Sequence, residues 1–284
     1  MTDFKRIKCI CFAGGGVRGL SHIGVLEALE TTTDFSLKNV VKCTGTSIGS
    51  LVALAVSLKY NIQEIKLIID KLYFPKLLSM SFFNLSHWGL DNGKNMMKFI
   101  EGILYTKTGI KDPTFKQLFD ITGVTLQVIG TNVTKNKEVC FSHLITPNMT
   151  VAKATMISMS LPILFRPIEH GGDLFTDGSI VNNRPFQPKY YEGIPWNECI
   201  FLEIDWPETK ITSFNSFICR ILYSLIKAQS TENYDQIKQN VIVSIVPYST
   251  VNFHLSQSTK QKIIQCGYLS VNYFIMRFNQ KEIL

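Results

Sequence analysis

Two glycine-containing motifs near the start of the chain have spacings that could support chemistry. Residues 14–19 read GGGVRG and match the GxGxxG spacing of a dinucleotide-binding turn between a strand and a helix. Residues 45–49 read GTSIG and match GxSxG, in which a sharp strand-to-helix turn exposes a nucleophilic serine, here Ser47. The first question is whether residues 14–19 bind a pyrophosphate or serve the chemistry of Ser47.

The glycine loop lacks the partner that a dinucleotide site requires. Such a site has an acidic residue near the end of its second strand, about 20 residues after the loop, which binds the ribose hydroxyls. Asp34 lies at about that distance, but it precedes the second predicted strand, which leads into CTGTSIGS instead. The amides of Gly15 and Gly16, at a helix N-terminus, could donate to a developing negative charge. The sequence therefore favours an oxyanion hole.

A nucleophilic serine needs a base, and the best candidate is a carboxylate. Asp177 ends a predicted strand in the segment FTDGSIVNNRP and could face Ser47 across the strand ends. The same Asp-Gly pair is also typical of an ordinary turn. None of the histidines lies in a recognisable catalytic motif, and His22 is interpreted as a packed helix residue. The histidines are His22, His87, His143, His170 and His254.

Strand-like and helix-like stretches alternate along the whole chain, which predicts an α/β fold. We expect a central, mainly parallel sheet with helices on both faces, and the candidate residues at the carboxyl ends of its strands. No linker or repeat interrupts the pattern, so we expect one domain over residues 1–284. Strands are predicted at 6–12, 39–43, 125–133, 138–141, 173–177, 198–205 and 241–247, and helices at 17–29, 48–58, 61–72 (N-cap Asn61), 151–160, 213–229 and 258–278.

The segment 73–88, YFPKLLSMSFFNLSHW, is rich in aromatic and apolar residues but lacks a clear periodicity. It fits core packing beneath a loop. It also fits a mobile lid or membrane-facing lip around Phe82, Phe83 and Trp88. The sequence leaves both alternatives open.

The composition limits the partners of the chain. The formal net charge is +7 with Lys and Arg scattered, which favours peripheral contact with an anionic membrane surface over nucleic acid binding. Seven cysteines without paired CxxC spacing argue against a disulfide framework and a structural zinc site. We find no long apolar run and no signal peptide, so we expect a cytoplasmic or intracellular protein without a transmembrane segment.

Taken in order, GGGVRG, GTSIG and DGSIVNNRP resemble the motifs of the patatin-like phospholipases, and ATMISMSLPILFRPIEH resembles the segment before that family's aspartate. The resemblance covers residues 8–188, and residues 189–284 fit as C-terminal strands and helices of the same domain. It implies a three-layer patatin-like fold with Ser47 as nucleophile and Asp177 as base. It also implies hydrolysis of acyl esters of phospholipids or neutral lipids, of the phospholipase A type, without calcium, another metal or a cofactor.

The resemblance also implies roles for the glycines around this dyad. Gly45 and Gly49 flank the nucleophile elbow. The oxyanion hole would be formed by the glycine loop, with a basic residue close by. Its residues are Gly14, Gly15, Gly16 and Arg18.

Two alternatives remain open from the residues themselves. An α/β-hydrolase triad would use Ser47, then Asp177 or Asp205, then His254. That fold normally places several strands before its elbow, whereas only about one predicted strand precedes this serine. A non-catalytic lipid-binding protein could also keep the same fold, although no residue that the chemistry needs is missing.

Overall fold

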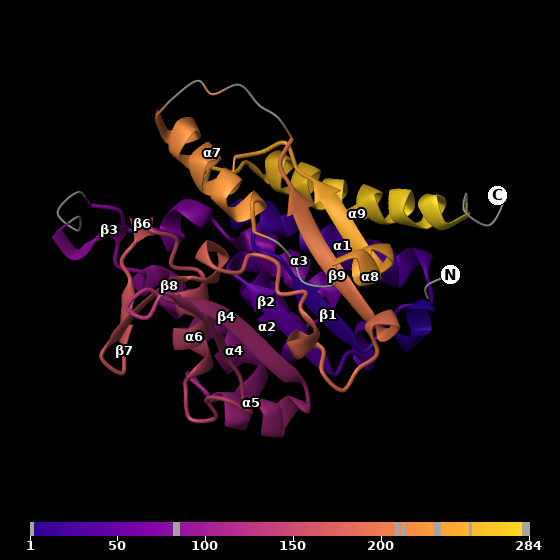
Figure 1. Cartoon of the computed structure of the whole chain (residues 1–284), viewed down its shortest axis with the longest axis horizontal. Coiled ribbons are helices and arrows are strands. Elements are labelled where there is room, and N and C mark those ends of the chain that lie inside the picture. Colours follow the sequence, from indigo (N-terminus) through magenta and orange to yellow (C-terminus); the bar gives the residue numbers. More distant parts are fainter. Residues whose placement is uncertain are drawn as a thin grey trace.

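The computed structural model describes residues 3–81, 86–207, 211, 214–229, 234–249 and 252–279. Its centre is a sheet with the strand order β10-β9-β1-β2-β4-β8-β7, and β5 pairs with β4 (Figure 1). β10, β9, β1, β2 and β4 are parallel, β5 and β8 are antiparallel to β4, and β7 is antiparallel to β8. The bounds are β1 Cys9–Phe12, β2 Lys42–Thr46, β4 Thr125–Asn132, β5 Lys137–Phe141, β7 Ile168–His170, β8 Asp173–Asp177, β9 Cys199–Asp205 and β10 Val241–Ile245.

Helices connect most of these strands, and a small parallel pair of strands, β3 (Gly89–Asp91) and β6 (Ile163–Phe165), lies outside the main sheet. None of the helices described is long and apolar enough to cross a bilayer. The helices are α1 Leu20–Thr32, α2 Ile48–Ser57, α3 Ile62–Lys71, α4 Lys94–Thr108, α5 Phe115–Thr122, α6 Val151–Ser158, α7 Phe214–Lys227, α8 Tyr234–Ile237 and α9 Gln257–Asn279.

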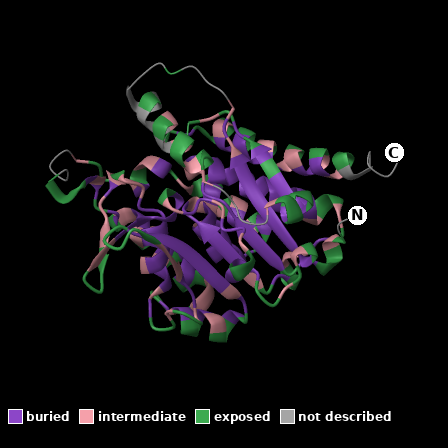
Figure 2. Cartoon of the chain, viewed as in Figure 1, coloured by how far each residue is buried: buried purple, intermediate pink, exposed green. Residues whose placement is uncertain are grey.

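The two faces of the main sheet are covered differently. Ile10, Cys43 and Val128 belong to a large apolar cluster that also contains residues of α1, α2, α3, α4, α6 and α9. Cys11 and Phe201 belong to a smaller cluster with the connecting segment 186–196 and α8. Figure 2 shows most of the central strands buried beneath these layers. The predicted α/β fold with a central, mainly parallel sheet and helices is confirmed, although the second face carries a long connection and little helix.

Local signals explain where several helices begin. Asn61 caps α3 as predicted: its Oδ1 accepts from the Glu64 amide at 2.9 Å, and Glu64 Oε2 accepts from the Asn61 amide at 2.8 Å. Thr114 and Gln117 form the same capping box at the start of α5. α4 and α5 were not predicted, although Gly109 and Gly123, both in the left-handed conformation, end them in the usual way. The predicted helix 17–29 instead begins at Leu20, after a 3₁₀ turn over Gly16–Gly19.

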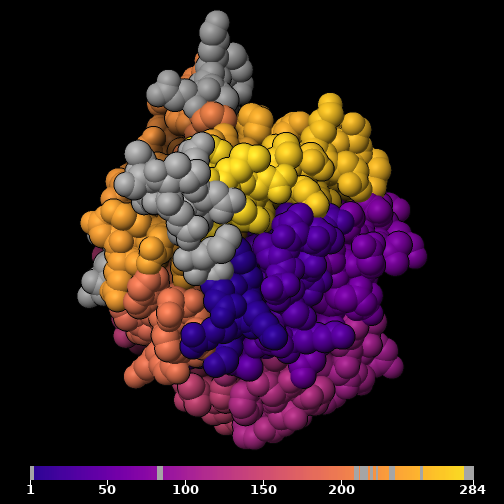
Figure 3. All heavy atoms as spheres, turned by 90° about the vertical axis from the view of Figure 1, so that its right-hand side faces the viewer, coloured from indigo at the N-terminus to yellow at the C-terminus, as the bar shows by residue number. Residues whose placement is uncertain are grey.

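The last long helix packs directly on the first. Gly24 of α1 faces α9, where a Cβ would overlap the carbonyl oxygen of Ile264; a Cβ at Gly267 of α9 would likewise overlap the carbonyl oxygen of Ser21. Figure 3 shows the C-terminal helix lying against the N-terminal part of the chain. The Phe4 and Phe274 rings add an edge contact with centroids 6.4 Å apart. We therefore propose that the C-terminal third forms one domain with the motif-bearing part.

This contact can be tested with matched glycine replacements. Gly267→Ala should lower the free energy of unfolding by about 3 kcal/mol, because the added methyl group forces two backbones apart. Gly102→Ala is the control: Gly102 lies within α4 with open space around its Cβ position, and the change should be neutral or stabilising by up to about 1 kcal/mol. Urea denaturation measures both. An unchanged midpoint for Gly267→Ala, or two separate transitions in the native chain, would contradict the one-domain proposal.

Candidate active site

The turn between β2 and α2 carries Ser47 in a conformation that side-chain-bearing residues rarely adopt. Its φ is 54° and its ψ is −130°. Flanking glycines make this turn possible: a Cβ at Gly45 would come within 2.5 Å of the Ser50 amide nitrogen. A Cβ at Gly49 would come within 2.6 Å of the Phe12 carbonyl oxygen. The turn therefore has the geometry of a nucleophile elbow.

The backbone of Ser47 is held by a second serine that the sequence analysis did not single out. Ser158, at the end of α6, accepts from the Ser47 amide at 2.9 Å and donates to the Ile129 carbonyl oxygen at 2.5 Å. Ser50 Oγ donates to the Ser47 carbonyl oxygen at 2.6 Å. No local spacing marks Ser158, because its partner lies 111 residues away in the sequence. These bonds fix the Ser47 backbone and leave its hydroxyl for another partner.

That partner is Asp177. Ser47 Oγ donates to Asp177 Oδ2 at 2.6 Å, and the Ser179 amide donates to Asp177 Oδ1 at 2.8 Å. The aspartate is 1% exposed, and burial raises its pKa to about 6 although the hydrogen bonds from Ser47 and Ser179 oppose this rise. A carboxylate with this pKa is ionised at neutral pH and is a stronger base than an ordinary aspartate.

The sheet register explains how Asp177 reaches Ser47, and it corrects one expectation. Asp177 was expected at the carboxyl end of a parallel strand, but β8 is antiparallel to β4. β4 continues past the end of β2: Thr46 lies opposite Ile129, and the next residue, Gly130, lies opposite Asp177. β8 therefore returns along the extension of β4 and ends level with the elbow.

The first glycine of the loop lies against the dyad, but its amide is already used. Gly14 N–H donates to the Asn183 carbonyl oxygen at 3.1 Å, so its hydrogen atom is not available to an oxyanion in this arrangement. Its lack of a side chain still matters, because a Cβ there would come within 2.6 Å of Ser179 Oγ and 3.1 Å of Ser47 Cβ. Gly14 thus keeps the space in front of Ser47 open.

Arg18 orients the next peptide of the loop. Its amide N–H (3.3 Å) and its Nε–H (3.2 Å) both donate to the Gly15 carbonyl oxygen. Because the carbonyl and the following N–H of a trans peptide point in opposite directions, Arg18 also fixes the direction of the Gly16 amide. Among the residues described, no hydrogen bond leaves the amide of Gly15 or Gly16. The buried guanidinium lies 5.1 Å from the centroid of the Trp206 ring.

A largely apolar pocket opens at Ser47 and Asp177. The glycine loop, Ser179 and Asn183 line it beside the dyad, and aliphatic and aromatic side chains line most of the rest. These side chains come from the motif-bearing part and from the C-terminal third, so residues outside the three motifs complete the pocket. They include Leu51, Phe74, Leu77, Met96, Phe99, Met159, Leu164, Phe165, Ile204, Tyr223, Ile226 and Phe253. Such a pocket suits an apolar chain whose polar end reaches Ser47.

The structure brings no histidine to this pocket among the residues it describes. His22 is buried on α1, its Nε2 lies 2.9 Å from the Ala13 carbonyl oxygen, and burial lowers its pKa to about 4. His254 is exposed, and Asp205 accepts hydrogen bonds from Tyr223 and Lys227. The arrangement thus differs from the alternative Ser-His-Asp triad.

The aromatic segment 73–88 divides into two parts. Phe74 and Leu77 are buried and line the pocket, whereas the Trp88 side chain is 66% exposed. Phe82 and Phe83 lie outside the described residues. Over the described part of the chain, no group of three or more His, Cys, Asp or Glu side chains is arranged to bind a metal ion.

Comparisons with known proteins identify a family, relatives and a structural neighbour. The model of the family described as patatin-like phospholipase matches residues 10–188. "Uncharacterized protein R571" of Acanthamoeba polyphaga mimivirus is 27% identical over 96% of this chain and 95% of its own length. "Probable lipid hydrolase 463L" of Invertebrate iridescent virus 6 is 30% identical over 64% of this chain and 62% of its own. The crystal structure of VipD from Legionella pneumophila has the same fold, with a TM-score of 0.74 at 16% identity over 96% of this chain and 67% of that one.

The raised pKa of Asp177 predicts how stability depends on pH. Its pKa is about 6 in the fold against 3.8 ordinarily, so the folded chain binds more protons between these values and loses stability as the pH rises through them. Asp177→Asn avoids the buried charge, donates to Ser47 and accepts from Ser179. It should be more stable than the native chain by about 2 to 3 kcal/mol at pH 8 and by little near pH 4.

Urea denaturation at the two pH values measures this difference. Asp235→Asn, which replaces a carboxylate whose side chain is 95% exposed, provides the baseline for an Asp-to-Asn change. A gain from Asp177→Asn of the same size at both pH values would contradict the assigned pKa.

Proposed function

The chain belongs to the patatin-like phospholipase family, and from this premise we propose that it is a serine hydrolase that cleaves carboxylic esters of phospholipids, of the phospholipase A type. The observation that carries the proposal is the 2.6 Å hydrogen bond from Ser47 Oγ to the buried Asp177 carboxylate. It lies beside glycine amides and opens into an apolar pocket. A nucleophile, a base, oxyanion donors and an acyl-binding surface are therefore available in one place.

The first half of the reaction forms an acyl-enzyme. Ser47 Oγ attacks the ester carbonyl carbon while Asp177 takes its proton. The amides of Gly15 and Gly16 donate to the oxyanion of the tetrahedral intermediate. The intermediate collapses, the bond to the alcohol breaks, and Asp177 returns the proton to the leaving oxygen. The raised pKa of Asp177 supports both roles, since a group that titrates near neutral pH can both accept and return a proton.

The second half regenerates the enzyme. Asp177 takes a proton from a water molecule that attacks the acyl carbonyl, and the same amides stabilise the second oxyanion. Ser47 then leaves with the proton from Asp177, and the fatty acid is released. In this scheme the negative charge is met by backbone amides, for which losing one donor typically costs about 10² to 10³ in turnover. We therefore propose that the reaction needs no calcium.

Removal of a single hydroxyl group tests whether Ser47 is the nucleophile. Ser47→Ala should abolish fluorophosphonate labelling and hydrolysis of acyl esters, because it removes the hydroxyl group that donates to Asp177 Oδ2. Ser57→Ala is the matched control: it also removes one buried hydroxyl, here at the end of α2, where Ser57 Oγ donates to the Leu54 carbonyl oxygen. Labelling is read by mass spectrometry, and fatty acid release from phospholipid, lysophospholipid and triacylglycerol vesicles is measured with and without a calcium chelator. Full labelling of Ser47→Ala would contradict the assignment.

We also propose that the protein binds lipid surfaces peripherally through α7. Phe217, Ile221 and Leu225 follow one another at four-residue intervals on this helix and are 46%, 41% and 64% exposed. Tyr223 and Ile226 of the same helix line the pocket, so the exposed stripe lies at the pocket wall. The net charge of +7 would add attraction to anionic lipid.

Substitutions of two exposed leucines distinguish an effect on membrane binding from an effect on ester hydrolysis. Leu225→Glu should weaken binding to anionic vesicles about tenfold, since an apolar group is lost from the contact, while hydrolysis of a short soluble ester is retained. Leu144→Glu is the control: Leu144 is 71% exposed, but it follows β5 near α5, at the opposite end of the molecule from α7 (Figure 1). Sedimentation with vesicles measures binding. Equal losses for the two variants, or an equal loss on the soluble ester, would contradict the proposal.

A further inference from the structure

One side chain just beyond α7 holds the loop that follows Asp177. Gln229 Oε1 accepts a hydrogen bond from the Asn183 amide at 2.9 Å. Its Nε2 donates to the carbonyl oxygens of Ser179 (2.8 Å) and Ile180 (3.1 Å). Both ends of this amide are therefore used, and all three partners are backbone groups of a single short loop.

The same loop carries the contacts that arrange the candidate site. The Ser179 amide donates to Asp177 Oδ1 at 2.8 Å, and the Asn183 carbonyl oxygen accepts from the Gly14 amide at 3.1 Å. Each residue thus has one backbone group on Gln229 and the other on the site. The Gln229 side chain binds one set of backbone groups of this loop, and Asp177 and Gly14 bind the other set.

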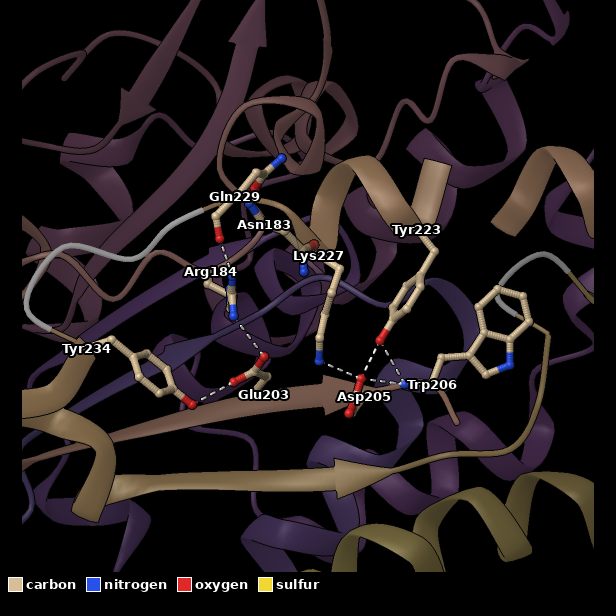
Figure 4. A network of polar contacts seen from close by, with 9 residues as sticks. All are labelled: Asn183, Arg184, Glu203, Asp205, Trp206, Tyr223, Lys227, Gln229 and Tyr234. Atoms are coloured by element: carbon tan, nitrogen blue, oxygen red, sulfur yellow. Dashed lines mark hydrogen bonds and ion pairs between the residues drawn. The ribbon is translucent and has the colours of Figure 1, made fainter. Parts of the chain in front are cut away.

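Gln229 is itself anchored to the end of the sheet. Arg184 donates to the Gln229 carbonyl oxygen and to Glu203 Oε1 of β9, the latter at 3.2 Å (Figure 4). Tyr234 also donates to Glu203 at 3.2 Å. The Arg184 and Glu203 side chains are only 15% and 9% exposed, so this support is partly shielded from water and less screened than a surface ion pair. Two residues earlier, at the end of α7, Lys227 pairs with Asp205 at 2.9 Å.

We propose that Gln229 is a positioning residue for the ester hydrolysis proposed above, on which this inference rests. It fixes the loop 178–183 so that the Ser179 amide stays on Asp177 and Asn183 stays on Gly14. It also ties α7, the helix with the exposed apolar stripe, to the base. A displacement of α7 at a lipid surface would therefore move Gln229 and, with it, the loop that donates to the Asp177 carboxylate.

The test replaces the amide by a side chain of similar length without hydrogen bonds. Gln229→Met should lower kcat for a short soluble ester about 10- to 100-fold with little change in KM, because the reacting groups lose their alignment while the pocket is kept. The acidic limb of kcat/KM should also move to higher pH. The Ser179 hydrogen bond lowers the pKa of Asp177, so loosening it lets that pKa rise.

Three comparisons make the result specific. Gln261→Met is the matched control, since Gln261 lies on α9 and its side-chain amide donates to Asp70 Oδ1 at 3.1 Å; the kinetics and pH profile of this variant should be native. Gln229→Asn keeps the amide one methylene short and should show a smaller change of the same kind. Hydrogen exchange at the Ser179 and Asn183 amides should be faster in Gln229→Met, at an unchanged melting temperature.

The outcomes separate this inference from the proposed function. The positioning role alone is overturned if Gln229→Met has native kinetics, a native acidic limb of kcat/KM and native hydrogen exchange. It is also overturned if kcat falls while that acidic limb stays at the same pH. If the native chain neither hydrolyses esters nor reacts with fluorophosphonate, the proposed function fails. Exchange then still decides whether Gln229 holds the loop: faster exchange at both amides supports that contact, and unchanged exchange overturns it.

Discussion

The hydrogen bond between Ser47 and Asp177 joins residues 130 positions apart, and much of the surrounding structure is needed to make it. A carboxylate that is 1% exposed is costly to keep ionised, so it must be held by donors and by a rigid backbone. The register of β4 with β2 and β8 brings the two side chains level. The hydrogen bond that the Ser47 amide donates to Ser158 Oγ fixes the backbone of one partner, and the hydrogen bond from the Ser179 amide fixes the carboxylate of the other.

The sequence contained the local parts of this arrangement. Gly45 and Gly49 mark the elbow because no side chain fits there, and the Asn61 cap is visible because both of its hydrogen bonds join residues three positions apart. The central sheet follows from the alternation of elements. The long-range parts were not visible: the direction of β8 depends on how far β4 extends past β2, and Ser158 gains its role only from the packing of α6.

The glycine loop shows the same limit of the sequence. The GGGVRG motif identifies the loop, but the fold gives each glycine different hydrogen-bond partners. Gly14 donates to Asn183, and the Gly15 carbonyl oxygen accepts from Arg18, which orients the next peptide. Only the amides of Gly15 and Gly16 are left for a substrate among the described contacts. Spacing identifies the loop, whereas the partners of each amide come from a segment far along the chain.

The family match ends at residue 188, but residues beyond it contact the motif-bearing part. Ile204, Tyr223 and Phe253 lie beyond that point and line the pocket, and Gln229 reaches back to the loop after Asp177. Residues before this point supply the proposed nucleophile, base and oxyanion donors. Residues after it supply part of the pocket wall, together with side chains from the motif-bearing part.

The edge contact between Phe4 and Phe274 has a topological consequence. The 3₁₀ turn Phe4–Arg6 and the last turns of α9 are neighbours, on the side of the molecule away from α7 (Figure 1). A short linker could therefore join the two ends without crossing the pocket, and the chain could be reopened at the exposed connection between α4 and α5. In such a circular permutant the glycine loop would follow the present C-terminal third in the sequence. We expect the contacts around Ser47 to be unchanged.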